Sequence, residues 1–136
     1  MEVIVHHLEG VKFEAATRGH RVICDQPRQN NGGDTGMTPP EFLLASLGTC
    51  AGYYAAEYLR TRKLSTGGLE VRVTAEKASG PARLASFRIE VTVPDLDPDH
   101  EAGVLRAVKA CLIHNTLMHA PAIDIALQTR VPAAIG

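Results

Sequence analysis

Cysteines are the side chains of this sequence best suited to chemistry, and two of the three occupy similar surroundings. Cys50 stands in the apolar run "PPEFLLASLGTCAGYYAAEYL", and Cys111 stands in "VLRAVKACLIHN". A lone cysteine in an apolar helix is usually a small hydrophobic residue. Two such helices packed on one sheet would, however, bring the thiols to disulfide distance, so that one attacks a substrate and the other resolves the product. We therefore treat Cys50 and Cys111 as a candidate redox pair.

Other candidate sites are weaker. Cys24, in "RVICDQ", has no obvious partner and is predicted to pack within a strand. The spacing Cys111-x-x-His114 suits zinc, but no second ligand pair follows at finger-like intervals, so we predict no metal. The loop "NGGDTGM" has neither GxGxxG nor a phosphate-loop lysine, and no Gly-x-Ser-x-Gly elbow is present. We predict no bound cofactor.

Length and composition limit the classes of protein to consider. The 136 residues predict one domain, 1–136, large enough to bury a core without a disulfide or metal. A net charge of −1, 4% aromatic residues and no Trp argue against nucleic-acid binding. The start "MEVIVHHLEG" does not resemble a signal peptide, and no apolar run reaches the roughly 20 residues that span a bilayer. We expect a cytoplasmic protein with reduced thiols.

The first half of the chain predicts strands followed by a long helix. "KFEAATRGHRVICDQ" has the pattern of two strands around a polar turn, and His6-His7 lie in an alternating N-terminal segment. After a glycine-rich loop, Thr38 and Glu41 have the spacing of a capping box. We predict a helix from Pro39 to about Arg62. Its middle is apolar nearly all round, as expected for a core or an interface.

The second half predicts a hairpin, a second helix and a last strand. "LEVRVTAEKA" and "RLASFRIEVTVP" alternate apolar and polar residues, as strands with one covered face do. Asp97-Pro98 predicts the start of a helix whose apolar stripe holds Val104, Val108, Cys111 and Leu112. "AIDIALQTRV" predicts a closing strand. The fold class is therefore α+β, an antiparallel sheet with two long helices on one face.

The blocks "DQPRQNNGGDTGMTPPEFLLASLGTC" and "VKACLIHNTLMHAPAIDIAL" resemble the OsmC/Ohr family of osmotically inducible and organic-hydroperoxide-resistance proteins. The likeness is closer to the uncharacterised OsmC-like branch than to the proven peroxidases. It implies an intertwined homodimer with its sites at the dimer interface. It also implies roles for two cysteines. Cys50 matches the peroxidatic cysteine, which reduces an organic hydroperoxide to an alcohol, and Cys111 matches the resolving cysteine. A dithiol such as dihydrolipoamide restores the thiols in relatives.

Activation of Cys50 requires help, because burial alone raises the pKa of a thiol. Relatives use an arginine held by a glutamate near the helix start, and Glu41 matches that glutamate. Nine residues separate Glu41 from Cys50, which places them on opposite sides of a straight helix, so Glu41 either serves this role or only caps the helix. Whether Arg18, Arg21, Arg28 or no cation activates the thiol stays open.

Two main functions follow from these observations. The first is a cysteine-based peroxidase that acts on organic hydroperoxides through Cys50 and Cys111. The alternative is a binding protein with a small apolar pocket at the dimer interface, lined by the same cysteines, that turns nothing over. A structural stress protein without a site is a third hypothesis, but it leaves the paired cysteines unexplained.

Overall fold

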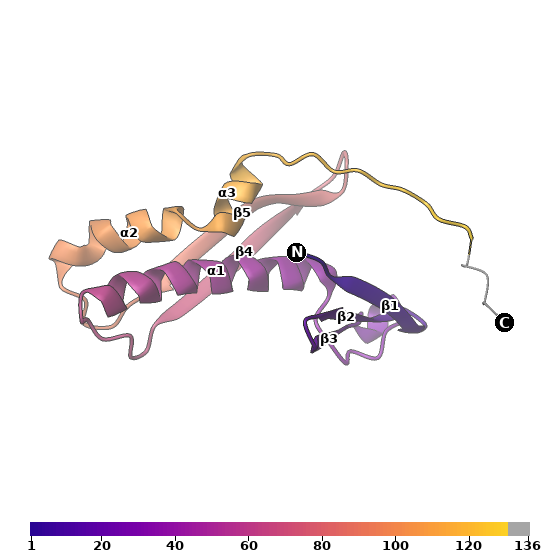
Figure 1. Cartoon of the computed structure of the whole chain (residues 1–136), viewed down its shortest axis with the longest axis horizontal. Helices are drawn as coiled ribbons and strands as arrows, with labels where there is room; N and C mark the ends of the chain where they lie inside the picture. The colour runs from indigo at the N-terminus through magenta and orange to yellow at the C-terminus, as the bar shows by residue number, and fades with distance from the viewer. Residues whose placement is uncertain (131–136) are drawn as a thin grey trace.

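The computed structural model describes residues 1–130 and has the α+β architecture predicted from the sequence (Figure 1). Its elements are β1 (Ile4–Glu9), β2 (Lys12–Thr17), β3 (His20–Cys24), the 3-10 turn η1 (Arg28–Asn30), α1 (Pro39–Thr61), β4 (Glu70–Ala78), β5 (Arg83–Thr92), the 3-10 turn η2 (Pro98–His100), α2 (Glu101–Lys109) and α3 (Leu112–Met118). Among the described residues, no helix is long and apolar enough to cross a membrane.

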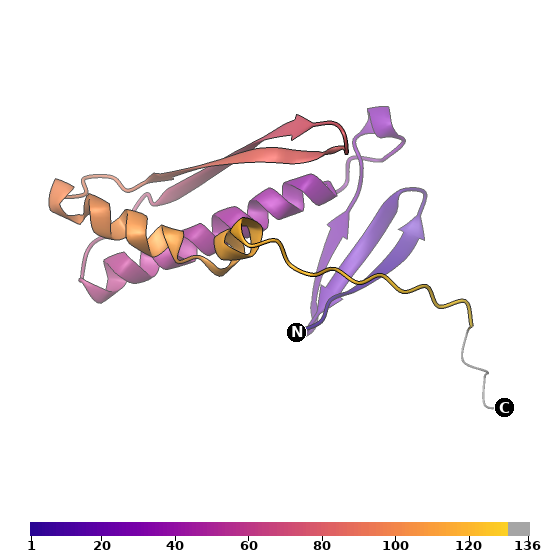
Figure 2. The same cartoon turned by 90° about the horizontal axis from the view of Figure 1, so that it is seen from above.

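Strands β1, β2 and β3 form an antiparallel sheet near the N-terminal end of α1, apart from the hairpin of β4 and β5 (Figure 2). The predicted N-terminal strands are confirmed. Paired residues share a face, and one face of this sheet is apolar: it carries Val5, Phe13, Ala15, Val22 and Cys24. Because Val5 and Val22 remain 57% and 48% exposed, the rest of the chain leaves this face largely uncovered.

A buried carboxylate organises the glycine-rich loop between β3 and α1. Asp25 is 1% exposed and accepts four hydrogen bonds. The donors are the hydroxyl and amide of Thr35 and the amides of Gln26 and Gly33. These bonds, with the Thr35 hydroxyl first, favour the charged form and lower the pKa of Asp25 to about 2. The loop therefore enters α1 in a fixed path.

Helix α1 begins and ends almost where the sequence predicts. Thr38 and Glu41 form the predicted capping box, because the Thr38 side chain accepts from the Glu41 amide and the Glu41 carboxylate accepts from the Thr38 amide. Two prolines follow the cap in the first turn, where they replace no helical hydrogen bond. The helix buries one face in the core and carries Cys50 midway along its length.

The predicted hairpin of β4 and β5 is also confirmed, and its apolar face packs on α1. The register pairs Val71 with Val91 and Val73 with Ile89, so these four side chains lie on the same face. A Cβ at Gly48 would lie 3.0 Å from the Val73 side chain. Gly48 therefore lets the hairpin pack closely against α1.

The second long helix is broken, which corrects the sequence-based prediction. Asp97 caps η2 instead of an α-helix, and α2 begins at Glu101 and ends at Lys109. Cys111 has an extended ψ of 130°, which interrupts the helical ladder before α3 begins at Leu112. Cys111 is fully buried while Leu112 is 59% exposed, so the two do not share one apolar stripe.

The core lies between α1, α2 and the hairpin. Its buried members are Ala51, Ala55, Leu59, Val104 and Val108. Gly103 lets α2 approach α1, because a Cβ there would lie 2.4 Å from the ring of Tyr58. The Tyr58 hydroxyl in turn bonds His100 at 2.9 Å. The part of the chain built from α1, α2 and the β4–β5 hairpin therefore forms a core of its own.

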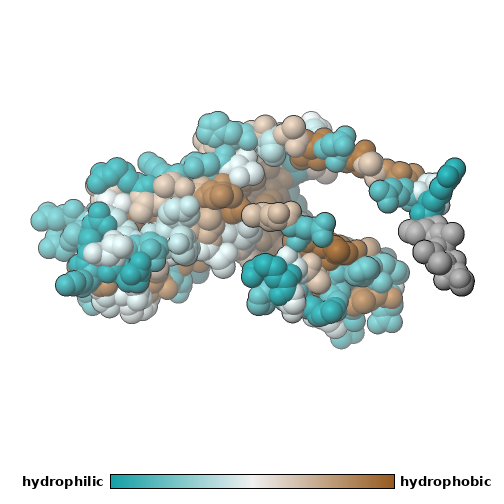
Figure 3. Space-filling model, viewed as in Figure 1, coloured by the Kyte–Doolittle hydropathy of each residue, from teal (hydrophilic) through white to brown (hydrophobic). Residues whose placement is uncertain are grey.

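The predicted C-terminal strand is wrong for the isolated chain. The segment after α3 is extended but pairs with no strand up to residue 130, where the description ends. Ile123, Ile125 and Leu127 point into solvent and are at least 79% exposed, and apolar atoms line this segment in Figure 3. An alternating pattern needs a free sheet edge beside it to become a strand, and this chain places none there. The rest of the predicted strand, from Val131 on, lies outside the described residues.

Candidate active site

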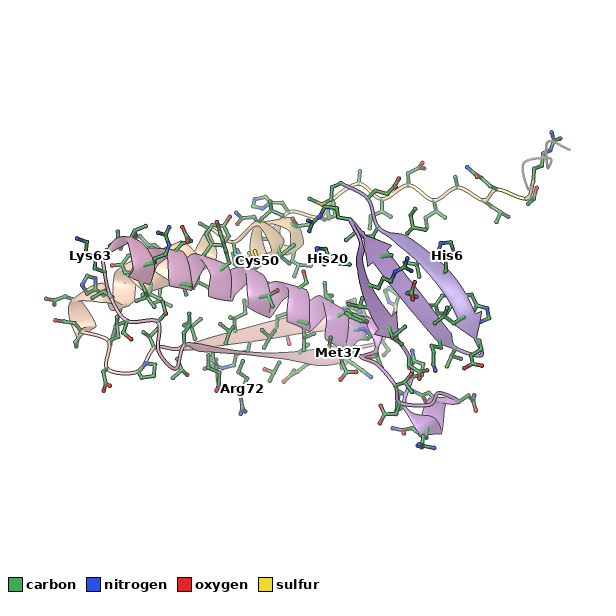
Figure 4. The ribbon with its side chains drawn as sticks, turned by 60° about the horizontal axis from the view of Figure 1, so that its bottom comes forward. His6, His20, Met37, Cys50, Lys63 and Arg72 are labelled. Atoms are coloured by element: carbon green, nitrogen blue, oxygen red, sulfur yellow. The ribbon has the colours of Figure 1, made fainter. Side chains whose placement is uncertain are left out.

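Helix α1 holds Cys50 at the edge of the core. Cys50 follows Leu47 by three residues and precedes Ala51, and both of these side chains are buried. Cys50 itself is half-buried. Its thiol is therefore fixed by the helix yet still reachable from solvent. Figure 4 shows Cys50 midway along α1, while His6 and His20 lie with the N-terminal sheet.

Cys111 lies in the break between α2 and α3. Its side chain is fully buried, and its sulfur accepts a hydrogen bond from the amide of His114 at 3.4 Å. The thiol therefore caps α3, where an oxygen side chain would more often serve. This role of the His114 amide could not be predicted from the sequence, because cysteine is not a usual capping residue.

The structure brings the two predicted cysteines together. Burial is the main cause that raises the pKa of Cys111, and hydrogen bonding between its thiol and that of Cys50 raises it further. Amide donors from His114 and Ile113 oppose these effects without cancelling them. Both cysteines are free thiols. Cys111 is thus held protonated beside a more accessible neighbour.

Glu41 is not brought to the sulfurs. Its carboxylate bonds the amide and the hydroxyl of Thr38, both at 2.9 Å, and these bonds lower its pKa. Nine residues of helix place Glu41 roughly 13 Å from Cys50 along the axis. Within this chain, Glu41 completes the capping box of α1, in which Thr38 is the N-cap.

The three candidate arginines also lie away from α1. Arg18 occupies the turn between β2 and β3, Arg21 pairs with Glu14 on the N-terminal sheet, and Arg28 begins η1. All three are exposed. Within residues 1–130, no hydrogen bond or ion pair links an arginine to Cys50. A cation that activates the Cys50 thiol would therefore have to come from outside the helices α1, α2 and α3.

Metal binding gains no support from the described residues, in which no three potential ligands gather at one place. The His114 ring instead has its Nδ1 3.3 Å from the side-chain oxygen of Asn115.

Comparisons with known proteins agree with this architecture. The family model described as OsmC-like protein matches residues 32–126. The chain belongs to the OsmC-like family. Its sequence is 30% identical over 144 residues to Protein YhfA of Escherichia coli K12, covering 98% of this chain and 100% of YhfA. The resemblance drawn from the two cysteine-containing blocks is therefore confirmed.

Solved structures of this family share the fold at lower sequence identity. An OsmC like protein from Mycoplasma pneumoniae superposes with a TM-score of 0.73 and 19% identity, over 88% of this chain and 87% of that one. An organic hydroperoxide resistance protein OsmC from Legionella pneumophila gives 0.59 and 14%, over 86% and 89%. At these identities the likeness concerns the fold alone.

Proposed function

We propose that the protein is a thiol-dependent peroxidase that reduces organic hydroperoxides. The observation that supports this most is the proximity of the thiols of Cys50 and Cys111, which are about 60 residues apart in the sequence. Disulfide formation requires two sulfurs in such an arrangement. The name of the Legionella relative, an organic hydroperoxide resistance protein, agrees with this chemistry.

The reaction proceeds in three steps. The Cys50 thiolate attacks the terminal oxygen of the hydroperoxide; an S–O bond forms, the O–O bond breaks, and the departing alkoxide takes a proton to become the alcohol. Cys50 is then a sulfenic acid. The Cys111 sulfur attacks the Cys50 sulfur, so that an S–S bond forms and hydroxide leaves with the Cys111 proton as water. A dithiol such as dihydrolipoamide returns both thiols by two exchanges and becomes a disulfide itself.

The surroundings of the two cysteines support this division of roles. Cys50 is half-buried and so reachable by a substrate, whereas Cys111 is fully buried. The raised pKa of Cys111 favours the protonated form of its thiol. That proton is then available to the leaving hydroxide.

The proposal includes a second copy of the chain. The apolar face of the N-terminal sheet, with Val5 and Val22, is largely uncovered, and the alternating segment after α3 has no strand partner up to residue 130. A homodimer in which the sheet of one copy packs on α1 of the other covers such surfaces. In this arrangement Arg18, in the turn between β2 and β3, is the arginine of the sheet that is not on the face opposite to Val22, and it is our candidate for the cation that the Cys50 thiol needs to ionise.

The dimer is tested with Val22→Asp, which places a charge on the uncovered apolar face. Light scattering coupled to gel filtration should give a dimer mass for the wild type and a monomer mass for this variant. Val22 is about half exposed, so the variant should still fold. A wild-type monomer at micromolar concentration would contradict the dimer.

The peroxidase is tested by following cumene hydroperoxide consumption and thiol loss. Cys50→Ser should lower the rate by at least about a hundredfold, because it removes the nucleophile. Cys111→Ser should allow one turnover and then leave a sulfenic acid on Cys50, which dimedone labels. Cys24→Ser is the control for loss of a thiol elsewhere; because Cys24 lies on the sheet face proposed to pack on the second copy, its dimer mass is measured first, and the dimeric variant should keep the wild-type rate. Equal, slow consumption by the wild type and by Cys50→Ser would exclude the proposal.

A second function is supported by the absence of an arginine partner for Cys50 among residues 1–130. Without a cation, the half-buried thiol would only line an apolar pocket that binds a ligand and leaves it unchanged. In that case fatty or aromatic ligands should stabilise the wild type and the Cys50→Ser/Cys111→Ser variant equally in a thermal melt. Consumption of hydroperoxide by the wild type would rule this alternative out.

A further inference from the structure

Helix α3 depends on Cys111 for the hydrogen bonds of its first turn. The Cys111 sulfur accepts from the His114 amide at 3.4 Å, and the Cys111 carbonyl accepts from the Asn115 amide at 3.0 Å. A thiol sulfur is a weak acceptor, and the side chains that usually cap helices present an oxygen instead. The side-chain cap of α3 is therefore weak and depends on the position of one sulfur atom.

The rest of the structure gives α3 little further support. The helix has seven residues, and none of them is buried. Within residues 1–130, its side-chain hydrogen bonds stay inside α3 and the residues beside it, as the bond from the Thr116 hydroxyl to the Leu112 carbonyl does. Helices this short are marginal in water. A change at the cap is therefore large relative to the interactions that keep α3 ordered.

The sulfur that caps α3 is also the one that meets Cys50. The two thiols lie close enough for a hydrogen bond between them. A disulfide requires more, because it brings the sulfurs to about 2.05 Å and holds the Cβ–S–S–Cβ dihedral near 90°. The Cys111 sulfur must move towards α1 to meet these requirements. The disulfide and the cap of α3 therefore compete for the same atom.

We propose that α3 is a redox-sensitive element, which is ordered while Cys111 is a free thiol and loosens when Cys111 is bonded to Cys50. We call this the α3 switch. In the redox step both thiols lose a proton, an S–S bond forms, and the oxidant takes up two electrons. A hydroperoxide is thereby cleaved at its O–O bond and leaves as an alcohol and water. The state of the pair is then displayed at the surface, by α3 and by the exposed segment that follows it (Figure 1).

Hydrogen exchange followed by mass spectrometry tests the α3 switch in the wild-type protein. One sample is reduced with dithiothreitol, and the other is oxidised with diamide, which accepts two electrons and two protons and needs no hydroperoxide. Peptide mapping verifies the bond between Cys50 and Cys111. The amides of α3 should exchange at least about tenfold faster in the oxidised sample, whereas those of α2 should change by less than about twofold. Equal exchange of α3 in the two samples overturns the switch.

Cys50→Ser is the matched control, because it keeps the Cys111 sulfur beside the His114 amide but cannot form the disulfide. Diamide should leave the exchange of α3 unchanged in this variant. Acceleration as large as in the wild type would show that the disulfide is not the cause and would overturn the switch.

Two changes at position 111 separate the cap from the disulfide. Cys111→Ala removes the acceptor and should give fast exchange of α3 without any oxidant. Cys111→Ser supplies an oxygen acceptor and should keep α3 protected with and without diamide. Equal exchange of α3 in the two variants would contradict the role of the cap. If Cys111→Ala does not fold, the wild-type comparison and Cys111→Ser decide the test.

The switch rests on the cysteine pair of the proposed peroxidase, but the two can fail separately. A protein that consumes cumene hydroperoxide and keeps α3 protected in its disulfide form overturns the switch alone. A protein that is inert towards hydroperoxide and loosens α3 after diamide overturns the peroxidase alone. Failure of diamide to join Cys50 to Cys111 overturns the switch, whatever the hydroperoxide assay shows.

Discussion

The two halves of the chain differ in how they cover their apolar side chains. The half built from α1, α2 and the β4–β5 hairpin has a closed core around Leu59 and Val108. The N-terminal sheet is described over its full length, and none of its side chains is buried. Asp25, which directly follows the sheet, is buried, but it is charged and accepts hydrogen bonds from the loop that leads to α1.

This difference shows which parts of the proposed site are present in a single copy of the chain. Cys50 and Cys111 lie near each other within the half with the closed core, so one copy of the chain is enough to bring them together. The candidate arginines Arg18 and Arg21 belong to the sheet without a core. In the proposed peroxidase, a cation for Cys50 would therefore have to come from a second copy of the chain.

Leu59→Ala should give the largest effect and tests the self-sufficient half. Leu59 is fully buried, so its truncation should lower the free energy of unfolding by about 2–5 kcal/mol, measured by urea denaturation. Val22→Ala in the N-terminal sheet is the comparison and should cost less than about 1 kcal/mol in a monomer. A loss at Val22 as large as that at Leu59 would show that the sheet also has a closed core in solution.

Gly103→Ala should have the next largest effect and tests the junction of α1 and α2. The new Cβ would force the Tyr58 ring off its hydrogen bond with His100 and its stacking with Arg62. We expect a loss of about 1–3 kcal/mol in urea denaturation. Gly52→Ala is the matched control, because its Cβ would make an ordinary 3.6 Å contact. A loss at position 103 no greater than at position 52 would contradict this account.

Thr38→Ala tests the point at which the two halves join. It removes the hydroxyl that caps α1 and should cost about 1 kcal/mol. The matched change is Thr49→Ala in the middle of the same helix, where the hydroxyl bonds a carbonyl that the helix already uses. That control should be nearly neutral. Equal stability of both variants in urea would mean that the capping box contributes little.

Asp25→Asn should have an effect that depends on pH and tests the loop between the halves. The pKa of Asp25 is about 2 in the folded protein, below its value of about 4 in the unfolded chain. The charged carboxylate therefore adds stability above pH 4, and this contribution is lost as the pH falls through 2. Urea midpoints measured at pH 7, 4 and 2 should fall more steeply for the wild type than for Asp25→Asn. Parallel profiles would contradict the assignment.

Much of the fold was predictable because its signals are local. The cap of α1 depends on Thr38 and Glu41, three residues apart, and the hairpin depends on alternation within each strand. The pairing of Cys50 with Cys111 followed from two helices sharing one sheet, although the extent of the second helix was wrong. These features were predictable from patterns within short stretches of the sequence.

The features that the sequence did not predict depend on distant neighbours. The break at Cys111 arises because its side chain turns into the interior, and an apolar stripe looks the same with or without such a break. The strand pattern around Ile123 is correct as a pattern, but a strand also requires an edge to pair with. The burial of Asp25 depends on donors up to ten residues away, such as Thr35.

The sequence separation of Cys50 and Cys111 has a mechanical consequence. A bond between their sulfurs would close a covalent ring of about 60 residues that includes the second half of α1, the hairpin and α2. By the loop-entropy relation, such a ring strengthens the fold by about 4 kcal/mol. Oxidation of the two thiols would therefore make the protein more stable against unfolding, until a reductant cleaves the disulfide.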